Sequence, residues 1–150
     1  MDIQSAENSP FTVVKSTKKG KFAQEIQMGK HLFMADEPTA DGGNDLGPSP
    51  YDLLLASLGA CTSMTIKMYA DLKKIPLENV IVKLKHEKKY ATDCVNCENS
   101  DAKIDHIERQ IQLQGALTQE QRDKLLTIAN HCPVHRTLTS KIIIKTQLID

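Results

Sequence analysis

The sequence has no net charge, no leader-like start and no long apolar run. Its 19 lysines and arginines balance 19 aspartates and glutamates, so it lacks the basic field that nucleic acids and anionic membranes attract. No fully apolar run approaches the roughly 18 residues that span a bilayer. The first ten residues also lack the basic start and apolar middle of a signal peptide. These absences predict a cytoplasmic protein without a nucleic-acid or membrane partner.

Cysteines are few, and they are Cys61, Cys94, Cys97 and Cys132. In a reducing compartment a disulfide framework is the poorer interpretation, and reactive, metal-binding or buried core thiols are better ones. The length of 150 residues fits one domain with its own core. We therefore predict a single domain over residues 1–150, with a disordered start at residues 1–10.

The first third of the chain predicts an antiparallel meander. Alternating apolar residues and intervening turns favour short strands at residues 11–16, 21–27 and 31–35. A loop rich in glycine and proline follows to Pro50. Ser49 is suited to cap a helix and Asp52 to reach back to the cap.

The helix that begins there is predicted to run from about Pro50 to Lys73 and to end at Ile75-Pro76. Its interior carries almost no charge, with Lys67 as the exception. Such a helix is expected to be buried on most faces, and we predict that it is the central helix of the fold.

The second half predicts further strands and one more helix. Strands are expected at residues 80–89 and 107–115, separated by a polar loop at 90–105, and at residues 141–148. A helix is predicted from Thr118, where Gln121 completes a capping box. Cys132-Pro133 ends it, with a short turn through Leu138. The order β-β-β-α-β-β-α-β indicates an α+β fold with antiparallel sheets around a buried central helix.

Two of the cysteines have different surroundings in the sequence. Cys61 lies in the middle of the apolar helix, where the simplest interpretation is a small residue filling the core. Cys132 lies between His131 and His135, close to Arg136, and a thiol near such residues ionises more easily. The residues alone leave open whether the two thiols meet.

Two segments resemble the motifs of a known family. GPSPYDLLLASLGACT at residues 47–62 resembles the first-cysteine motif of the OsmC/Ohr family, and HCPVHRTL at 131–138 resembles its Cys-Pro motif. The resemblance implies an intertwined homodimer with active sites at the subunit interface. It also implies reduction of organic hydroperoxides without a cofactor, as a defence against oxidative stress. Cys61 would attack the peroxide, Cys132 would resolve the sulfenic acid, and an external dithiol would reduce the disulfide.

The chain departs from the best-studied members of that family at two positions. Their activating glutamate is replaced by Tyr51, with Asp52 beside it, and no arginine precedes Arg109. Asp52 or Tyr51 is then expected to orient the thiol, and Arg136 or an N-terminal lysine to supply positive charge. The departure favours the uncharacterised OsmC-like branch. It also supports a second interpretation, in which a non-catalytic protein binds a small apolar ligand near Cys61.

The remaining pair forms the CxxC of Cys94 and Cys97 in the polar loop. The strand and helix that flank a thioredoxin-type CxxC are not apparent. A zinc site with His86 and His106 is an alternative. The interpretation we favour is an ordinary loop with two thiols and no metal.

Overall fold

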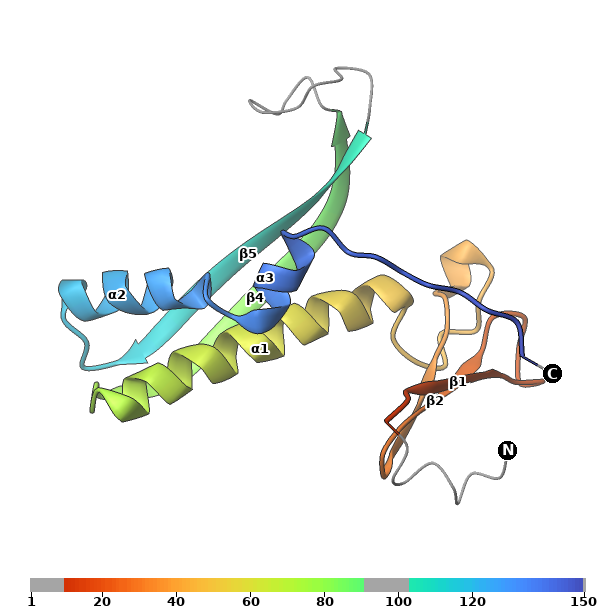
Figure 1. Cartoon of the computed structure of the whole chain (residues 1–150), viewed down its shortest axis with the longest axis horizontal. Coiled ribbons are helices and arrows are strands. Elements are labelled where there is room, and N and C mark those ends of the chain that lie inside the picture. The colour runs from red at the N-terminus through yellow and green to blue at the C-terminus, as the bar shows by residue number, and fades with distance from the viewer. Residues whose placement is uncertain (1–9, 91–102, 150) are drawn as a thin grey trace. The chain divides into compact units, whose positions relative to one another are not determined.

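The computed structural model describes residues 10–90 and 103–149 (Figure 1). The chain divides into two compact units, Met1–Leu54 and Leu55–Asp150, which are treated separately below. The polar loop with Cys94 and Cys97 lies outside the described residues.

The first unit contains the predicted meander. Its strands are β1 (Val13–Ser16), β2 (Gln24–Met28) and β3 (His31–Ala35), paired antiparallel in that order. A short 3-10 helix, η2 (Thr39–Asp41), follows. The buried Asp36 carboxylate accepts hydrogen bonds from the backbone N–H groups of residues 37, 44 and 46. A buried carboxylate needs hydrogen-bond donors. Because the loop backbone supplies these donors, the bonds fix the conformation of the loop that leads to the next helix.

The long helix α1 (Pro50–Leu72) begins as the sequence predicts. The Ser49 N–H and hydroxyl donate to the Asp52 carboxylate at 3.0 and 2.7 Å, and the Asp52 N–H donates to Ser49 Oγ at 3.2 Å. These reciprocal bonds satisfy donors that a helix start leaves unpaired.

The prediction that α1 is buried on most faces is wrong for the single chain. Its buried residues form one stripe at helical spacing, namely Leu58, Gly59, Thr62, Ile66 and Ala70. Met64, Met68 and Leu72 are 69%, 70% and 75% exposed. The physical reason is that one chain offers a packing partner for only one side of this helix.

The expectation about membrane-spanning length also needs correction. By length and composition, α1 is long and apolar enough to cross a bilayer, although 28% of its most apolar 18-residue stretch is buried inside the protein. Core helices pass the same test, so this property alone does not identify a membrane segment.

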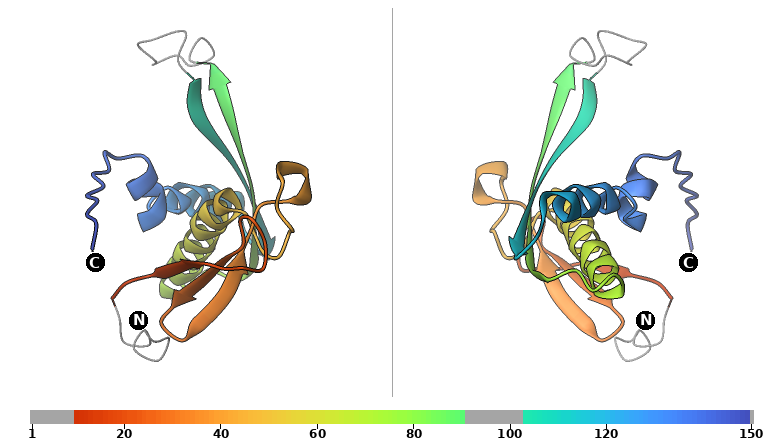
Figure 2. Two further views of the ribbon diagram at one scale, coloured as in Figure 1. Left: turned by 90° about the vertical axis from the view of Figure 1, so that its right-hand side faces the viewer. Right: turned by 90° about the vertical axis from the view of Figure 1, so that its left-hand side faces the viewer.

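The second unit is built on a two-stranded antiparallel ribbon of β4 (Leu77–Tyr90) and β5 (Lys103–Gly115). Both strands are longer than predicted, and the two views of Figure 2 show the ribbon extending beyond the helices on one side of it. Since side chains alternate, Val80, Val82 and Leu84 of β4 lie on one face, and their cross-strand neighbours on that face are Leu113, Ile111 and Arg109.

That face carries the core of the second unit. Ile66 and Ala70 of α1 and Leu125 and Ala129 of α2 (Gln119–Ala129) are buried there, with apolar residues of β4 and β5 packed against them. The predicted capping box of Thr118 and Gln121 is confirmed. A short helix, α3 (Pro133–Leu138), occupies the predicted turn.

The predicted strand at residues 141–148 is wrong. Residues 141–149 have no regular secondary structure and are exposed, with Ile143 and Ile144 at 75% and 84%. A strand needs a partner edge to satisfy its N–H and C=O groups, and within the described residues this segment pairs with no strand. Its β-branched residues favour an extended conformation locally, but no neighbouring strand among the described residues pairs with it.

Candidate thiol site

The structure brings the two predicted thiols together. Cys61 lies in the middle of α1, Cys132 caps α3, and the two thiols lie close enough for each to influence the pKa of the other. Both are free thiols. They differ in access, because Cys61 is half-buried whereas Cys132 is completely buried.

The local sequence explains how Cys132 is positioned. Pro133 occupies the first position of α3, where its missing N–H costs nothing and its fixed φ favours the helix. The Cys132 sulfur takes the place of a capping oxygen and accepts the His135 N–H at 3.4 Å. The Cys-Pro pair thus holds the buried sulfur toward backbone donors.

Hydrogen bonding overcomes burial at Cys132. Burial is the largest single influence and raises the pKa of this thiol. Donation from the Cys61 thiol, from the backbone N–H groups of His135 and Val134, and from the Thr62 side chain together outweighs it. The pKa of Cys132 is therefore below its ordinary value.

Cys61 behaves in the opposite way. Burial raises its pKa first, and donation of its S–H to Cys132 raises it further. Hydrogen bonds from the Val134 backbone and the Thr65 side chain offset only part of this rise. The pKa of Cys132 is thus lowered and that of Cys61 raised, and the two sulfurs lose their protons as an interacting pair.

Arg109 of β5 joins this hydrogen-bond network through Thr62, and sequence reasoning missed it. Its Nη1 donates to Thr62 Oγ1 at 2.9 Å and to the Ala129 carbonyl at 3.3 Å, and its Nη2 donates to Asn130 Oδ1 at 2.8 Å. One signal was available in the sequence. Arg109 interrupts the alternating apolar positions Ile107, Ile111 and Leu113, and a charge on an apolar face normally has a specific partner.

A cavity of about 330 Å³ lies between α1, β5 and α3. Neither cysteine lines it, but Leu58 precedes Cys61 by three residues and the N–H of His135 binds the Cys132 sulfur. Leu58, Ile107 and Leu138 form its apolar part, and Arg109 and His135 are among its polar lining residues. Burial, and then the charge of Arg109, lower the pKa of His135, so its imidazole is neutral near pH 7. Arg109 is thus the positive group of this cavity wall.

The other predicted site residues, Tyr51, Asp52 and Arg136, are all exposed. Tyr51 and Asp52 are exposed in the first turn of α1, about three helical turns before Cys61. The pKa of Asp52 is lowered by hydrogen bonds from Ser49, first from its side chain and then from its backbone. Arg136 is exposed on α3. The expected catalytic roles of these three residues remain predictions.

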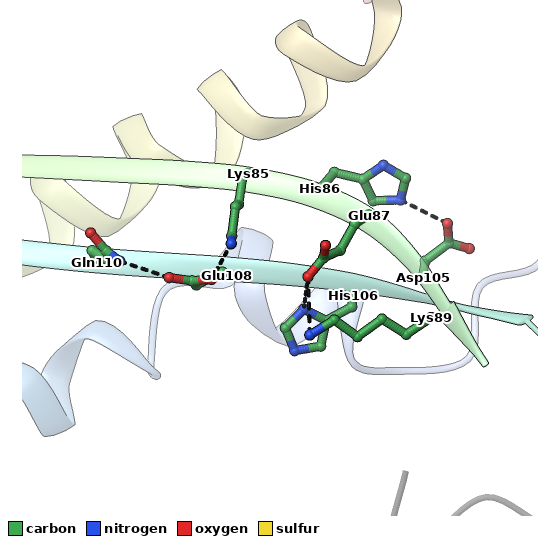
Figure 3. Close-up of polar contacts among 8 residues, drawn as sticks. All are labelled: Lys85, His86, Glu87, Lys89, Asp105, His106, Glu108 and Gln110. Atoms are coloured by element: carbon green, nitrogen blue, oxygen red, sulfur yellow. Dashed lines mark hydrogen bonds and ion pairs between the residues drawn. The ribbon is translucent and has the colours of Figure 1, made fainter. Parts of the chain in front are cut away.

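The alternative zinc ligands do not meet within the described residues. His86 lies 2.7 Å from the Asp105 carboxylate on the helix-facing side of the ribbon, whereas His106 faces Glu87 at 3.7 Å on the outer side (Figure 3). Over residues 10–90 and 103–149, no group of three or more potential ligands is placed to hold a metal. Cys94 and Cys97 fall outside these ranges.

Comparison with protein families gives a match over most of the chain. The model of a family described as OsmC-like protein matches residues 42–147. That range includes both cysteine motifs, α1 and the whole β4–β5 ribbon. No curated protein sequence matches the chain.

Solved structures share the fold. An OsmC-like protein from Mycoplasma pneumoniae has a TM-score of 0.66 at 15% identity, covering 85% of each chain. An organic hydroperoxide resistance protein OsmC from Legionella pneumophila has a TM-score of 0.61 at 21% identity, covering 86% of this chain and 89% of that one. A Vibrio cholerae protein provisionally described as an organic hydroperoxide resistance protein, with captopril bound in one of its active sites, has a TM-score of 0.58 at 18% identity, covering 88% and 87%.

Proposed function

The chain belongs to the OsmC-like protein family, and we propose that it reduces organic hydroperoxides with Cys61 and Cys132, in cytoplasmic defence against oxidative stress. The observation that carries the proposal is that the two thiols lie close enough to influence each other's pKa. A partly apolar cavity lined by Leu58 of α1 and His135 of α3 adds to it. A sulfenic acid formed on one sulfur is then within reach of the other, which makes the oxidation reversible.

The different surroundings of the two sulfurs suggest how they divide the work. Cys132 ionises more readily but is completely buried, whereas Cys61 is accessible. We propose that the Cys132 thiolate accepts the Cys61 proton as peroxide arrives. Cys61 then attacks the terminal peroxide oxygen and the O–O bond breaks. The leaving alkoxide takes the proton held by Cys132 and becomes the alcohol, which restores the Cys132 thiolate.

The second half of the cycle returns the protein to its dithiol form. Cys132 sulfur attacks the sulfenic sulfur of Cys61, a disulfide forms, and the oxygen leaves as water. An external dithiol reduces that disulfide by two electrons through a mixed disulfide and becomes oxidised itself. No metal or organic cofactor takes part in this scheme.

The exposed apolar surface supports a homodimer. Five large apolar side chains are more than two-thirds exposed, namely Met64, Met68 and Leu72 of α1 and Ile143 and Ile144 of the C-terminal segment. Exposed apolar surface on this scale favours association with another chain. A partner subunit would cover α1 and provide an edge for residues 141–149. Sedimentation should give a dimer, and a double substitution of Met64 and Met68 by lysine should give monomers. A monomeric native protein would exclude this arrangement.

The direct test is peroxide turnover with a dithiol reductant. Stopped-flow consumption of an alkyl hydroperoxide should exceed that of hydrogen peroxide, because the cavity offers apolar contacts. Cys61→Ser should abolish consumption. Turnover by the native protein that is no faster than that of Cys61→Ser would refute the proposed activity.

Trapping the sulfenic acid tests the division of labour. In Cys132→Ser the resolving thiol is absent, so a dimedone adduct should accumulate on Cys61 after one equivalent of peroxide. In Cys61→Ser no adduct should form on Cys132, because its sulfur is buried. An adduct on Cys132 instead would reverse the assigned roles.

The cavity also favours a second candidate, a non-catalytic protein that binds a small apolar molecule beside Cys61. Captopril is bound in one of the active sites of the Vibrio cholerae neighbour, so the active site of that protein admits a small molecule. Native mass spectrometry should then find a copurified small molecule that Leu58→Trp displaces. Rapid Cys61-dependent turnover would reject this candidate.

A further inference from the structure

We propose that Arg109 and Thr62 act as a positioning pair. The guanidinium holds the threonine hydroxyl in place, so that this hydroxyl can rotate and donate a hydrogen bond to the sulfur of Cys132. This inference deepens the proposed thiol chemistry and rests on it. It assigns a task to an arginine of β5 and to the residue that directly follows Cys61.

The hydrogen-bond count around Thr62 carries the inference. Arg109 Nη1 donates to Thr62 Oγ1 at 2.9 Å, and that hydroxyl donates to the Leu58 carbonyl at 2.7 Å. Its side chain also lies within hydrogen-bonding reach of Cys132. A hydroxyl has one proton, so it cannot serve the carbonyl and the sulfur at once.

The two acceptors therefore define two states. With Cys132 protonated, the Thr62 proton points to the Leu58 carbonyl. With Cys132 ionised, the proton turns to the negative sulfur, since hydrogen bonds to charged groups are the stronger ones. Arg109 occupies a lone pair of the same oxygen in both states, so the oxygen stays in place while its proton turns.

The shape of the arginine side chain suits this task. Its other contacts, to the Ala129 carbonyl and Asn130 Oδ1 at the end of α2, fix the plane of the guanidinium. Thr62 is completely buried, so water does not replace the donor. A lysine ammonium at this place would carry the charge without the rigid fork.

A purely structural arginine is the competing explanation, and the chain offers a matched example of one. Arg122 donates to the Leu113 and Gly115 carbonyls at 2.9 and 3.5 Å. It holds the link between β5 and α2, and these two hydrogen bonds reach neither thiol. Substitution at Arg122 should therefore affect folding stability without affecting the thiols.

The experiment is an ultraviolet thiolate titration of the full-length reduced protein. Cys94→Ser and Cys97→Ser are introduced into every sample, so that Cys61 and Cys132 are the only thiols that titrate. Arg109→Gln and Thr62→Val should each raise the midpoint of the first thiol ionisation by about one pH unit, the size expected for a lost hydrogen bond to an anion. Thr62→Ser keeps the hydroxyl and should titrate like the parent, as should Arg122→Gln.

Each result decides the matter. An unchanged titration in folded Arg109→Gln overturns the inference, and so does an equal shift in Arg122→Gln. If Arg109→Gln does not fold, the Thr62 variants decide, because an equal shift in Thr62→Ser and Thr62→Val would show that the hydroxyl is irrelevant. Absorbance does not depend on turnover, so a protein inactive toward peroxides would refute the proposed function and leave this test intact.

Discussion

The two faces of the β4–β5 ribbon use charge in different ways. On the outer face, Lys85 pairs with Glu108 at 2.8 Å and Lys89 with Glu87 at 3.0 Å, all at least one-third exposed (Figure 3). On the helix-facing side, Arg109 lies opposite Leu84 and binds Thr62 and the end of α2. The first arrangement is a row of local pairs, and the second joins three elements.

The difference follows from solvent. Exposed ion pairs contribute little, because water and salt screen them and holding two long side chains together costs entropy. Two of the oxygens that Arg109 satisfies, Thr62 Oγ1 and the Ala129 carbonyl, belong to buried residues, and leaving such groups unpaired costs the full desolvation penalty. The number of charges on a surface is therefore a poor guide to their importance in this protein.

The largest expected effect comes from removing the inner charge. Arg109→Gln should lower the free energy of unfolding by about 2 kcal/mol, because it removes charged donors from the Thr62 hydroxyl and the Ala129 carbonyl. The measurement is denaturant unfolding at one fixed protein concentration. The matched outer-face variant, Lys85→Gln, should shift Tm by less than about 2 °C. Similar losses from both variants would show that the two faces are equivalent.

The helix ends were predictable because their causes are local. Ser49 and Asp52, Thr118 and Gln121, and the break at Cys132-Pro133 each act over a few residues, and each appears in the structure. A cap needs no distant partner. The motif resemblance added the pairing of Cys61 with Cys132, which the residues alone left open.

The incorrect predictions have one physical cause. A local sequence pattern does not show which distant surface a helix or strand packs against. Alternation predicted the strand containing Arg109 but not that Thr62 packs over it. The apolar surface of α1 predicted burial, and residues 141–148 predicted a strand, yet the single chain covers neither. Burial and strand pairing are decided by surfaces distant in sequence or on another chain.

The next effect concerns pH and tests how far the field of Arg109 extends. Burial and Arg109 lower the pKa of His135 in the folded protein, so the unfolded chain takes up this proton first as the pH falls. Stability should therefore decline on acidification through about pH 6.5, the ordinary histidine value. His135→Asn should weaken that decline when unfolding is measured at pH 7.5 and pH 5.5.

A nearby histidine provides the control for this pH effect. His131 is exposed just before Cys132, and His131→Asn should leave the acid-induced loss of stability as it is in the native protein. Arg109→Gln should reduce the loss, because it removes the repelling charge. A loss that is identical in the native protein and in His135→Asn would place the titrating group elsewhere.

The smallest expected effect is the coupling within an outer-face pair. A double-mutant cycle of Lys85→Gln and Glu108→Gln should give a coupling that shifts Tm by less than about 2 °C. The pKa of Glu108 is lowered, chiefly by its hydrogen bond from Lys85, so the coupling should fade as the pH drops and Glu108 gains a proton.

The coupling between Lys85 and Glu108 should also fade in molar salt, whereas the effect of Arg109→Gln should persist there. A coupling of Lys85 with Glu108 that survives high salt would mean that the outer face is shielded from water, as it would be beneath a partner subunit.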